Sequence, residues 1–265
     1  MIDTYLRGFE RIAASDDGGT DAPEWARSLR LSAITRFEAL GFPTKKNEDW
    51  HYTSVQPIAE REFELLAPPA REVTAARLAP FAFGAGEWHT LVFVNGRYDE
   101  SLSSTADLPD GVTVLPLARA YEEAELLVEQ YLGKIAAYEA HTFTALNTAF
   151  LDEGAVVHVA ADVELARPVH LLFVTDPSVG TGMSQPRNLI VLDRSAKATV
   201  IESYAALEDG EYFTNVVTEA VVGDGATLTH LKLQRESSEA FHVGTVDVRQ
   251  ARDSHLVSFS FATGA

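Results

Sequence analysis

After Gly154 the sequence loses helical periodicity and becomes a series of short β-branched runs, each closed by a turn. The runs lie at 156–159, 169–174, 189–192, 199–201, 216–222, 228–233, 246–248 and 257–261. Arg167-Pro168, Asp209-Gly210 and Gly223-Asp224-Gly225 lie in the turns. Short strands spaced this closely, with no long helix between them, restrict this part of the chain to a β-sandwich, a β-barrel or a β-helix. The runs resemble one another too weakly for the residues alone to choose among these three folds.

The first 150 residues carry helical patterns instead. Helices are predicted near 2–12, 23–40, 117–132 and 143–150, and a strand with a tight Asn-Gly turn at 91–96. Asp16-Asp17-Gly18-Gly19 is expected to end the first helix, since glycine disfavours helix continuation. We therefore expect a helix-rich α+β region over residues 1–150 and a mainly β region over residues 151–265.

The balance of charge limits the partners of this chain. With 39 Asp and Glu against 21 Lys and Arg, the net charge is −18, which repels nucleic acid and anionic lipid. No apolar run reaches the roughly 18 residues that a membrane helix needs. The N-terminus has no basic start followed by an apolar stretch, as a signal peptide would have. These features predict a cytoplasmic protein that binds neither nucleic acid nor membrane.

The sequence contains no cysteine. This excludes disulfides, thiolate catalysis and any zinc or iron–sulfur centre held by cysteines of this chain. Any cluster chemistry would need sulfur ligands from outside these 265 residues.

Motifs for common catalytic chemistry are missing. Gly133-Lys134 is followed by Ile135, so it does not complete a phosphate-binding loop. Gly84-Ala85-Gly86 lacks the third glycine of a dinucleotide loop, and the 182–186 segment runs into Pro186 and fails as a nucleophile elbow. We therefore predict no catalytic residue and no enzyme activity.

Two pairs of histidines are spaced for a conceivable metal site. His158 and His170 lie 12 positions apart, as do His230 and His242, so stacked strands could bring them together. No closer His spacing supports a metal, and hydrogen-bonded or surface histidines are the favoured interpretation.

Charged residues elsewhere are interpreted as structural. The acidic run on the helix near residue 125 is expected to be a solvated face; it comprises Glu122, Glu123, Glu125 and Glu129. Arg187 and Glu202 are expected at strand ends as interface or structural residues, and the structural role is the favoured interpretation. Trp50 and Tyr52 are expected to anchor the N-terminal region by apolar packing with a polar tip.

Four segments together resemble SufD-type proteins of the SufB/SufD family. They are Gly41 to Thr53, Val92 to Tyr98 with Leu102-Ser103, Phe143 to Gly154 continuing to Val169, and Pro186 to Leu189 continuing through Val200 to Tyr204. They occur in the family's order, and the likeness spans about residues 25–261.

The resemblance implies a fold and a function that spacing does not. SufD-like proteins have an N-terminal helical region, a right-handed parallel β-helix and a C-terminal helical region. They pair with SufB through the β-helix, bind the ATPase SufC through the C-terminal part, and serve iron–sulfur cluster assembly without being ATPases. The family continues beyond Ala265, and its cluster-related histidine and ATPase-contacting region lie there. We therefore expect a C-terminally truncated SufD-like scaffold with no catalytic, cofactor-binding or metal-binding residue in this chain, in a complex that handles iron–sulfur clusters.

Two other functions are compatible with a β-rich fold of this kind. A β-helix carbohydrate-active enzyme of the pectin-lyase type needs clustered Asp, Lys and Arg on one strand face, and no such basic cluster is evident. A β-rich interaction module of unknown partner is the third interpretation.

The last strand, 257–261, is expected to present unpaired backbone groups, and its apolar side chains are expected to pack against a further rung. Self-association through this end is therefore expected.

Overall fold

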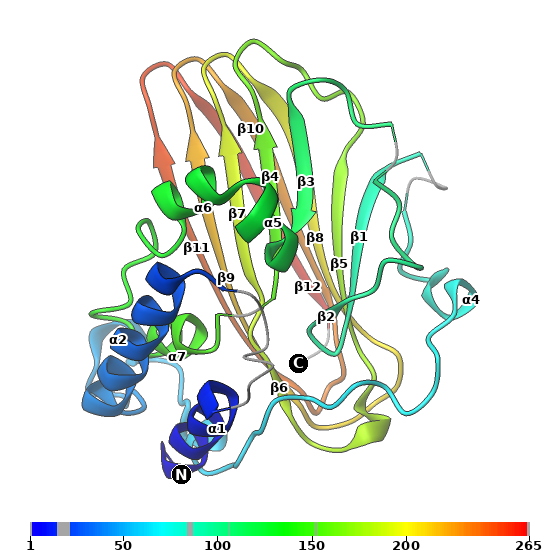
Figure 1. The fold of residues 1–265 in the computed structure, drawn as a ribbon. Helices are drawn as coiled ribbons and strands as arrows, with labels where there is room; N and C mark the ends of the chain where they lie inside the picture. The colour runs from blue at the N-terminus through cyan, green and yellow to red at the C-terminus, as the bar shows by residue number, and fades with distance from the viewer. Residues whose placement is uncertain (1, 15–21, 84–86, 106, 152, 264–265) are drawn as a thin grey trace.

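The fold is a stack of parallel strands arranged as a coil, in a computed structural model that describes residues 2–14, 22–83, 87–105, 107–151 and 153–263 (Figure 1). The expected break at 16–19 and the segment Gly84 to Gly86 lie outside the described residues. One sheet has the strand order β12-β10-β8-β5-β1-β2, and the other has β11-β9-β7-β4-β3, with β6 paired to β9. The strands are β1 (His89–Val94), β2 (Arg97–Tyr98), β3 (Val112–Pro116), β4 (Ala155–Val159), β5 (Val169–Thr175), β6 (Met183–Ser184), β7 (Arg187–Leu192), β8 (Lys197–Ala206), β9 (Phe213–Val222), β10 (Thr227–Arg235), β11 (Phe241–Gln250) and β12 (His255–Thr263).

Long strands alternate between the two sheets along the chain, which makes each consecutive pair one rung of a β-helix. β4 with β5, β7 with β8, β9 with β10 and β11 with β12 form four rungs, and each strand pairs in parallel with its counterpart in the next rung. The predicted parallel β-helix is confirmed, and all eight β-branched runs lie within strands. The sandwich and the barrel are thereby excluded for this part of the chain.

A repeated turn sets the corner of every rung. Asp162, Ser195, Gly225 and Asp253 occupy the same corner in successive rungs and all have positive φ, of 63°, 59°, 67° and 55°. The amide of each of the first three donates to a carbonyl oxygen in the next corner, on Arg194, Asp224 and Arg252, at 2.8–2.9 Å. Gly, Asn and Asp tolerate this left-handed conformation better than other residues, so the corners favour short polar residues or glycine.

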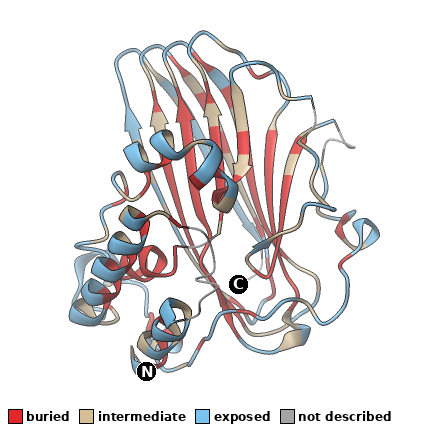
Figure 2. Cartoon of the chain, viewed as in Figure 1, coloured by how far each residue is buried: buried red, intermediate tan, exposed pale blue. Residues whose placement is uncertain are grey.

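Hydrophobic packing on both faces of the sheets stabilises this coil. Between the sheets, apolar side chains of successive rungs stack, and Phe93, Phe173 and Tyr204 form a ladder with ring centroids 4.7 and 5.1 Å apart. Outside the β4-β7-β9 sheet, helices pack against buried strand residues such as Leu189 and Val191. Figure 2 shows the resulting burial, which is greatest in the central strands and falls off toward β11 and β12.

The N-terminal part supplies both helices and strands. Its helices are α1 (Ile2–Ala14), α2 (Glu24–Leu40), η1 (Glu48–Trp50), α3 (Gln56–Ala59), α4 (Ala75–Leu78), α5 (Leu117–Glu123), α6 (Glu125–Tyr131) and α7 (Thr142–Ala149), and η3 (Pro177–Val179) follows later. β1 pairs in parallel with β5, and β3 pairs antiparallel with β4, so both extend the sheets beyond the first rung. The division at residue 150 stays a prediction.

The prediction of a single acidic helix over 117–132 is wrong, because this segment forms two helices. Ala124 has φ −137° and ψ 31°, outside the helical region, and separates α5 from α6. The four glutamates of this segment are nonetheless exposed, as expected for a solvated face. Among the described helices, none combines the length and the apolar character that crossing a bilayer requires.

The apolar side chains of β12 point in a different direction from the one expected. Leu256 pairs in register with the interior residue Leu228, so alternation places Ser258 and Ser260 inside the coil. Phe259 and Phe261 therefore lie on the outer face, where they are 59% and 50% exposed. A group that packs against Phe259 and Phe261 would therefore cover the outer face of the sheet, whereas a further rung would stack on the end of the coil. Self-association through this end stays a prediction.

Trp50 and Tyr52 differ in their packing. The Trp50 ring is partly buried and lies 5.1 Å from the Phe143 ring, within the core that joins α1, α2 and α7. Tyr52 is 95% exposed, and its ring contacts only that of its neighbour His51 among the aromatic contacts of the described residues. The anchoring role is thus borne by Trp50, and the expectation for Tyr52 is wrong.

Replacing these two residues should separate their contributions. Trp50→Ala should lower the free energy of unfolding by roughly 2 kcal/mol, less than the ~3–5 kcal/mol of a fully buried ring, because the ring is only partly buried. Tyr52→Ala should change it by less than about 0.5 kcal/mol. Urea denaturation of both variants measures the difference, and equal destabilisation would contradict the packing described here.

Candidate functional site

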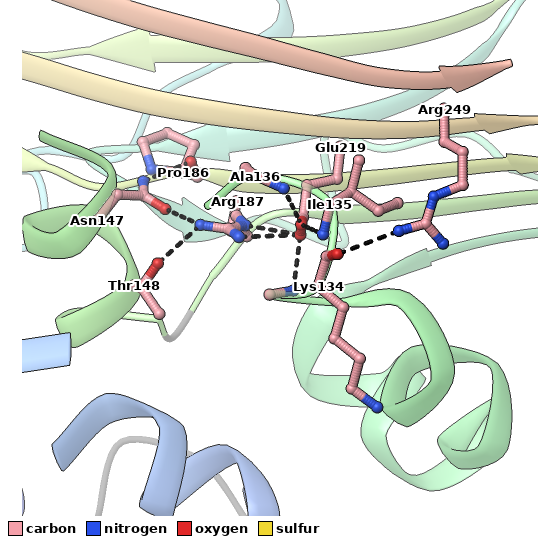
Figure 3. A network of polar contacts seen from close by, with 10 residues as sticks. Lys134, Ile135, Ala136, Asn147, Thr148, Pro186, Arg187, Glu219 and Arg249 are labelled. Carbon is pink, nitrogen blue, oxygen red and sulfur yellow. Dashed lines mark hydrogen bonds and ion pairs between the residues drawn. The ribbon is translucent and has the colours of Figure 1, made fainter. Parts of the chain in front are cut away.

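The most deeply buried charged pair joins two neighbouring strands of the β-helix. Arg187, the first residue of β7, and Glu219, on β9, both have fully buried side chains. The Nε and Nη2 atoms of Arg187 lie 3.1 and 2.9 Å from Oε2 of Glu219. Figure 3 shows this pair between the sheet and the layer of helices.

Each member of the pair also binds the N-terminal part of the chain. Glu219 accepts hydrogen bonds of 2.8 Å from the backbone amides of Gly133, Ile135 and Ala136. Arg187 donates to the Asn147 amide oxygen at 3.1 Å and to the Thr148 hydroxyl at 3.0 Å (Figure 3). The pair therefore fastens α7 and the 133–136 loop to the coil, in agreement with the structural role expected for Arg187.

A second polar cluster lies inside the coil, in its later rungs. Oε1 of Glu202 lies 2.9 Å from Nε2 of His230 and accepts a hydrogen bond of 2.7 Å from the Thr218 hydroxyl. Its other oxygen accepts a bond of 2.6 Å from the Tyr204 hydroxyl. Glu202 stands in the middle of β8 and points inward, so its expected place at a strand end is wrong.

The cluster continues toward the last rung. Glu236 lies 2.7 Å from Nδ1 of His242 and accepts a bond of 2.8 Å from Thr214. Nε2 of His242 lies 2.7 Å from Nζ of Lys232. Tyr204 joins the two halves, because its ring meets that of His242 at 5.0 Å and lies 5.4 Å from Nζ of Lys232. We call this set the polar core; it comprises Glu202, Tyr204, Thr214, Thr218, His230, Lys232, Glu236 and His242.

Burial and pairing set the charges in the polar core. Burial alone would raise the pKa of Glu202, but the charge of His230 and three hydrogen bonds lower it to about 2. Burial alone would lower the pKa of His230, and the Glu202 carboxylate raises it instead. Burial and the neighbouring Glu202 carboxylate raise the pKa of Tyr204 far above its usual value. Glu202 and His230 thus form a buried ion pair that a neutral Tyr204 supports.

The two histidine pairs suggested by spacing differ: His230 and His242 both belong to the polar core but bond to different carboxylates, whereas His158 and His170 lie in different sheets. His158 bonds to Asp193 at 2.9 Å in one sheet, while His170, in the other, bonds to Ser203 at 2.8 Å. Burial lowers the pKa of His170 to about 4. Hydrogen-bonded histidines, the favoured interpretation, describe all four residues. In the part of the chain that the structure describes, no group of three or more His, Asp or Glu side chains could hold a metal ion.

Lys232 and Glu236 are the functional candidates that sequence reasoning missed. The alternation Leu228, His230, Lys232 places the two polar residues on the same interior face as a core leucine. That alternation was the available signal, since a charged residue in phase with core positions must find a buried partner.

Two protein-family models match consecutive parts of this chain. The family described as the SufBD protein N-terminal region matches residues 15–171, and the SufBD core domain of the SUF iron–sulfur cluster assembly system matches residues 173–265. The chain belongs to the SufBD family.

Members of this family in three bacteria illustrate the likeness. An iron–sulfur cluster assembly SufBD family protein of Synechocystis is 32% identical over 244 residues, covering 89% of this chain and 53% of the relative. SufD of Escherichia coli is 27% identical over 230 residues, covering 84% and 50%. SufD of Bacillus subtilis is 26% identical over 241 residues, covering 88% and 54%. The chain thus spans about half the length of these SufBD relatives.

The buried Arg187–Glu219 pair gives a stability prediction. Glu219→Ala leaves a buried guanidinium without its counter-ion and three amides without their acceptor, so it should cost roughly 3–5 kcal/mol. Glu164→Ala, which breaks an exposed ion pair with Lys197, should cost at most about 1 kcal/mol. Urea denaturation compares the two, and similar losses would contradict a fastening role for the buried pair.

The Glu202–His230 pair gives a prediction for pH. The lowered pKa of Glu202 adds stability above pH 4.5, which is lost as the pH falls toward 2, and the raised pKa of His230 adds stability below pH 6.5, which is lost as the pH rises through its folded value. The stability difference between the wild type and Glu202→Gln should therefore be largest between pH 4.5 and pH 6.5. Denaturation at about pH 3, 5.5 and 9 measures it, and a difference independent of pH would refute the pairing.

Proposed function

We propose that this chain is a non-catalytic scaffold subunit for iron–sulfur cluster assembly and transfer, working with SufB-like and SufC-like subunits in the cytoplasm. The observation that carries the proposal is the match to both SufBD domains, in order, over nearly the whole chain. The names of the relatives point to the same process, since they are described as iron–sulfur cluster assembly proteins.

The chemistry of the chain supports a scaffold that relies on partners. Without cysteine, these 265 residues cannot supply thiolate ligands to a cluster, so we assign those ligands to groups outside them. The chain lacks a phosphate-binding loop in its sequence, so we assign ATP hydrolysis to the SufC-like subunit. The buried charged pair Arg187–Glu219 is fully engaged in fastening the two parts of the chain, a role that suits a rigid support.

The outer face of β12 supports pairing with a related subunit. It carries the exposed apolar side chains Val257, Phe259 and Phe261. We propose that a SufB-like subunit covers this apolar face.

Co-expression with the SufB-like and SufC-like proteins of the same genome tests the proposal. The wild type should co-purify with the SufB-like subunit, and Phe259→Lys should weaken that association because it places a charge on the apolar surface. Leu31→Lys is the matched control: Leu31 is 56% exposed on α2, against 59% for Phe259, and its replacement should leave the complex intact.

Reconstitution of the isolated chain with iron and sulfide provides the second measurement. The chain alone should form no stoichiometric cluster after gel filtration, whereas the co-purified complex should. A stoichiometric cluster on the isolated chain, or failure of the wild type to associate with a SufB-like subunit, would contradict the proposal.

A further inference from the structure

A cavity of about 270 Å³ lies between α1 and the segment 63–65, which runs beside β6 (Figure 1). Its apolar lining comes from α1, the 63–65 segment, the end of α7 and β6, and includes Gly8, Ile12, Leu65, Phe150 and Met183. We propose that this cavity binds a small uncharged apolar molecule with about the bulk of two fused aromatic rings, a function separate from the proposed scaffold role.

Both sides of the cavity are held by contacts within the chain. Leu65 forms a parallel bridge with Met183, whose backbone amide donates to the Glu64 carbonyl oxygen at 2.7 Å. On the other side, the Phe9 ring of α1 meets the Phe150 ring edge-on, with centroids 6.3 Å apart. The cavity is therefore formed before any ligand arrives, as most small-molecule sites are.

Gly8 keeps the α1 side of the cavity open. Glycine in the middle of a helix is unfavourable relative to alanine, so its presence there calls for a reason. A Cβ atom at Gly8 would lie 3.7 Å from the Phe150 ring, an ordinary van der Waals contact, and the backbone of Gly8 is helical. Neither close packing nor backbone geometry requires glycine at this position, and its effect is to leave space beside Phe150.

The chemistry of the lining favours an uncharged ligand. Arg11 and Glu64 are its charged residues among those described, and they pair with each other at 2.9 Å, so each already has a counter-ion. The Thr4 hydroxyl accepts a hydrogen bond of 3.3 Å from Arg7. Burial raises the pKa of the Tyr5 phenol, so that group is neutral as well. A charged molecule would lose its hydration in the cavity without gaining a free partner of opposite charge.

The volume of the cavity sets the size of the ligand. An apolar cavity of about 150 Å³ holds one benzene ring. A volume of about 270 Å³ therefore accommodates two fused rings or a short branched hydrocarbon. The described lining residues all lie between Thr4 and Met183, so the site does not involve β11 or β12.

Two probes with the same ring system test the class of ligand. Near neutral pH, 2-naphthol is uncharged, whereas 2-naphthoate carries a carboxylate. In isothermal titration calorimetry with the 265-residue chain, 2-naphthol should bind saturably at one site, and 2-naphthoate should bind at least about tenfold more weakly. Absence of saturable 2-naphthol binding would overturn the site, and equal or tighter binding of 2-naphthoate would overturn the proposed class of ligand.

A leucine placed in the cavity tests its location. Gly8→Leu should weaken 2-naphthol binding roughly tenfold or more by filling the space, without lowering the melting temperature, since it removes a glycine from a helix. Ala13→Leu puts the same side chain at an exposed position of α1 and should leave binding unchanged. Phe259→Lys should also leave it unchanged, because Phe259 lies on the outer face of β12. Loss of binding in either control, or full binding in Gly8→Leu, would contradict the assignment.

A measurement on the wild type decides the matter even if Gly8→Leu fails to fold. Met183 is one of two methionines in the chain and lines the cavity. With ¹³C-labelled methionine methyl groups, the Met183 signal, assigned through Met183→Leu, should shift when 2-naphthol binds, because an aromatic ring then lies beside it. An unchanged Met183 signal at saturating 2-naphthol would overturn the proposal.

Discussion

The hydrogen bonding between successive rungs is the constraint on which the rest of this structure depends. Each of the strands β7, β8, β9 and β10 pairs with one strand of the rung before and one of the rung after, so neighbouring rungs must keep the same register. The corners follow from that requirement, since Asp162, Ser195 and Gly225 must all adopt positive φ for their amides to reach the next corner. The interior follows as well, because a fixed register stacks Phe93, Phe173 and Tyr204 in one column.

Charges inside such a stack are tolerated only when they are paired, and two of the buried pairs, Arg187–Glu219 and Glu202–His230, have different roles. Arg187 and Glu219 face outward from the sheet and meet the helical layer, so their effect is to join two parts of the chain. Glu202 and His230 face inward, where no backbone donor needs them. The outward pair joins the helical layer to the coil, and the inward cluster ties successive rungs to one another.

The sequence alone locates the strands, but it does not show that they stack as a β-helix. β-branched runs are local signals, so all eight predicted runs fall within strands. The spacing between equivalent residues falls from 33 positions, between Val156 and Leu189, to 28 positions, between Phe213 and Phe241, which hides the repeat. The polar core was missed because several of its contacts join residues 16, 22 and 28 positions apart, separations that only the register of the strands defines. The break at Ala124 was missed because alanine favours helix, and tertiary packing overrides that preference.

The two strands that the first part of the chain adds to the sheets have a consequence for how the molecule is made. β1 and β3 lie beside β5 and β4, yet they precede both in the chain, so a ribosome releases them first. The earliest rung thus emerges into the presence of strands already able to template it, and every later rung finds its template in the one before. Growth of the coil can follow the direction of synthesis, with a single exposed end that advances as translation proceeds.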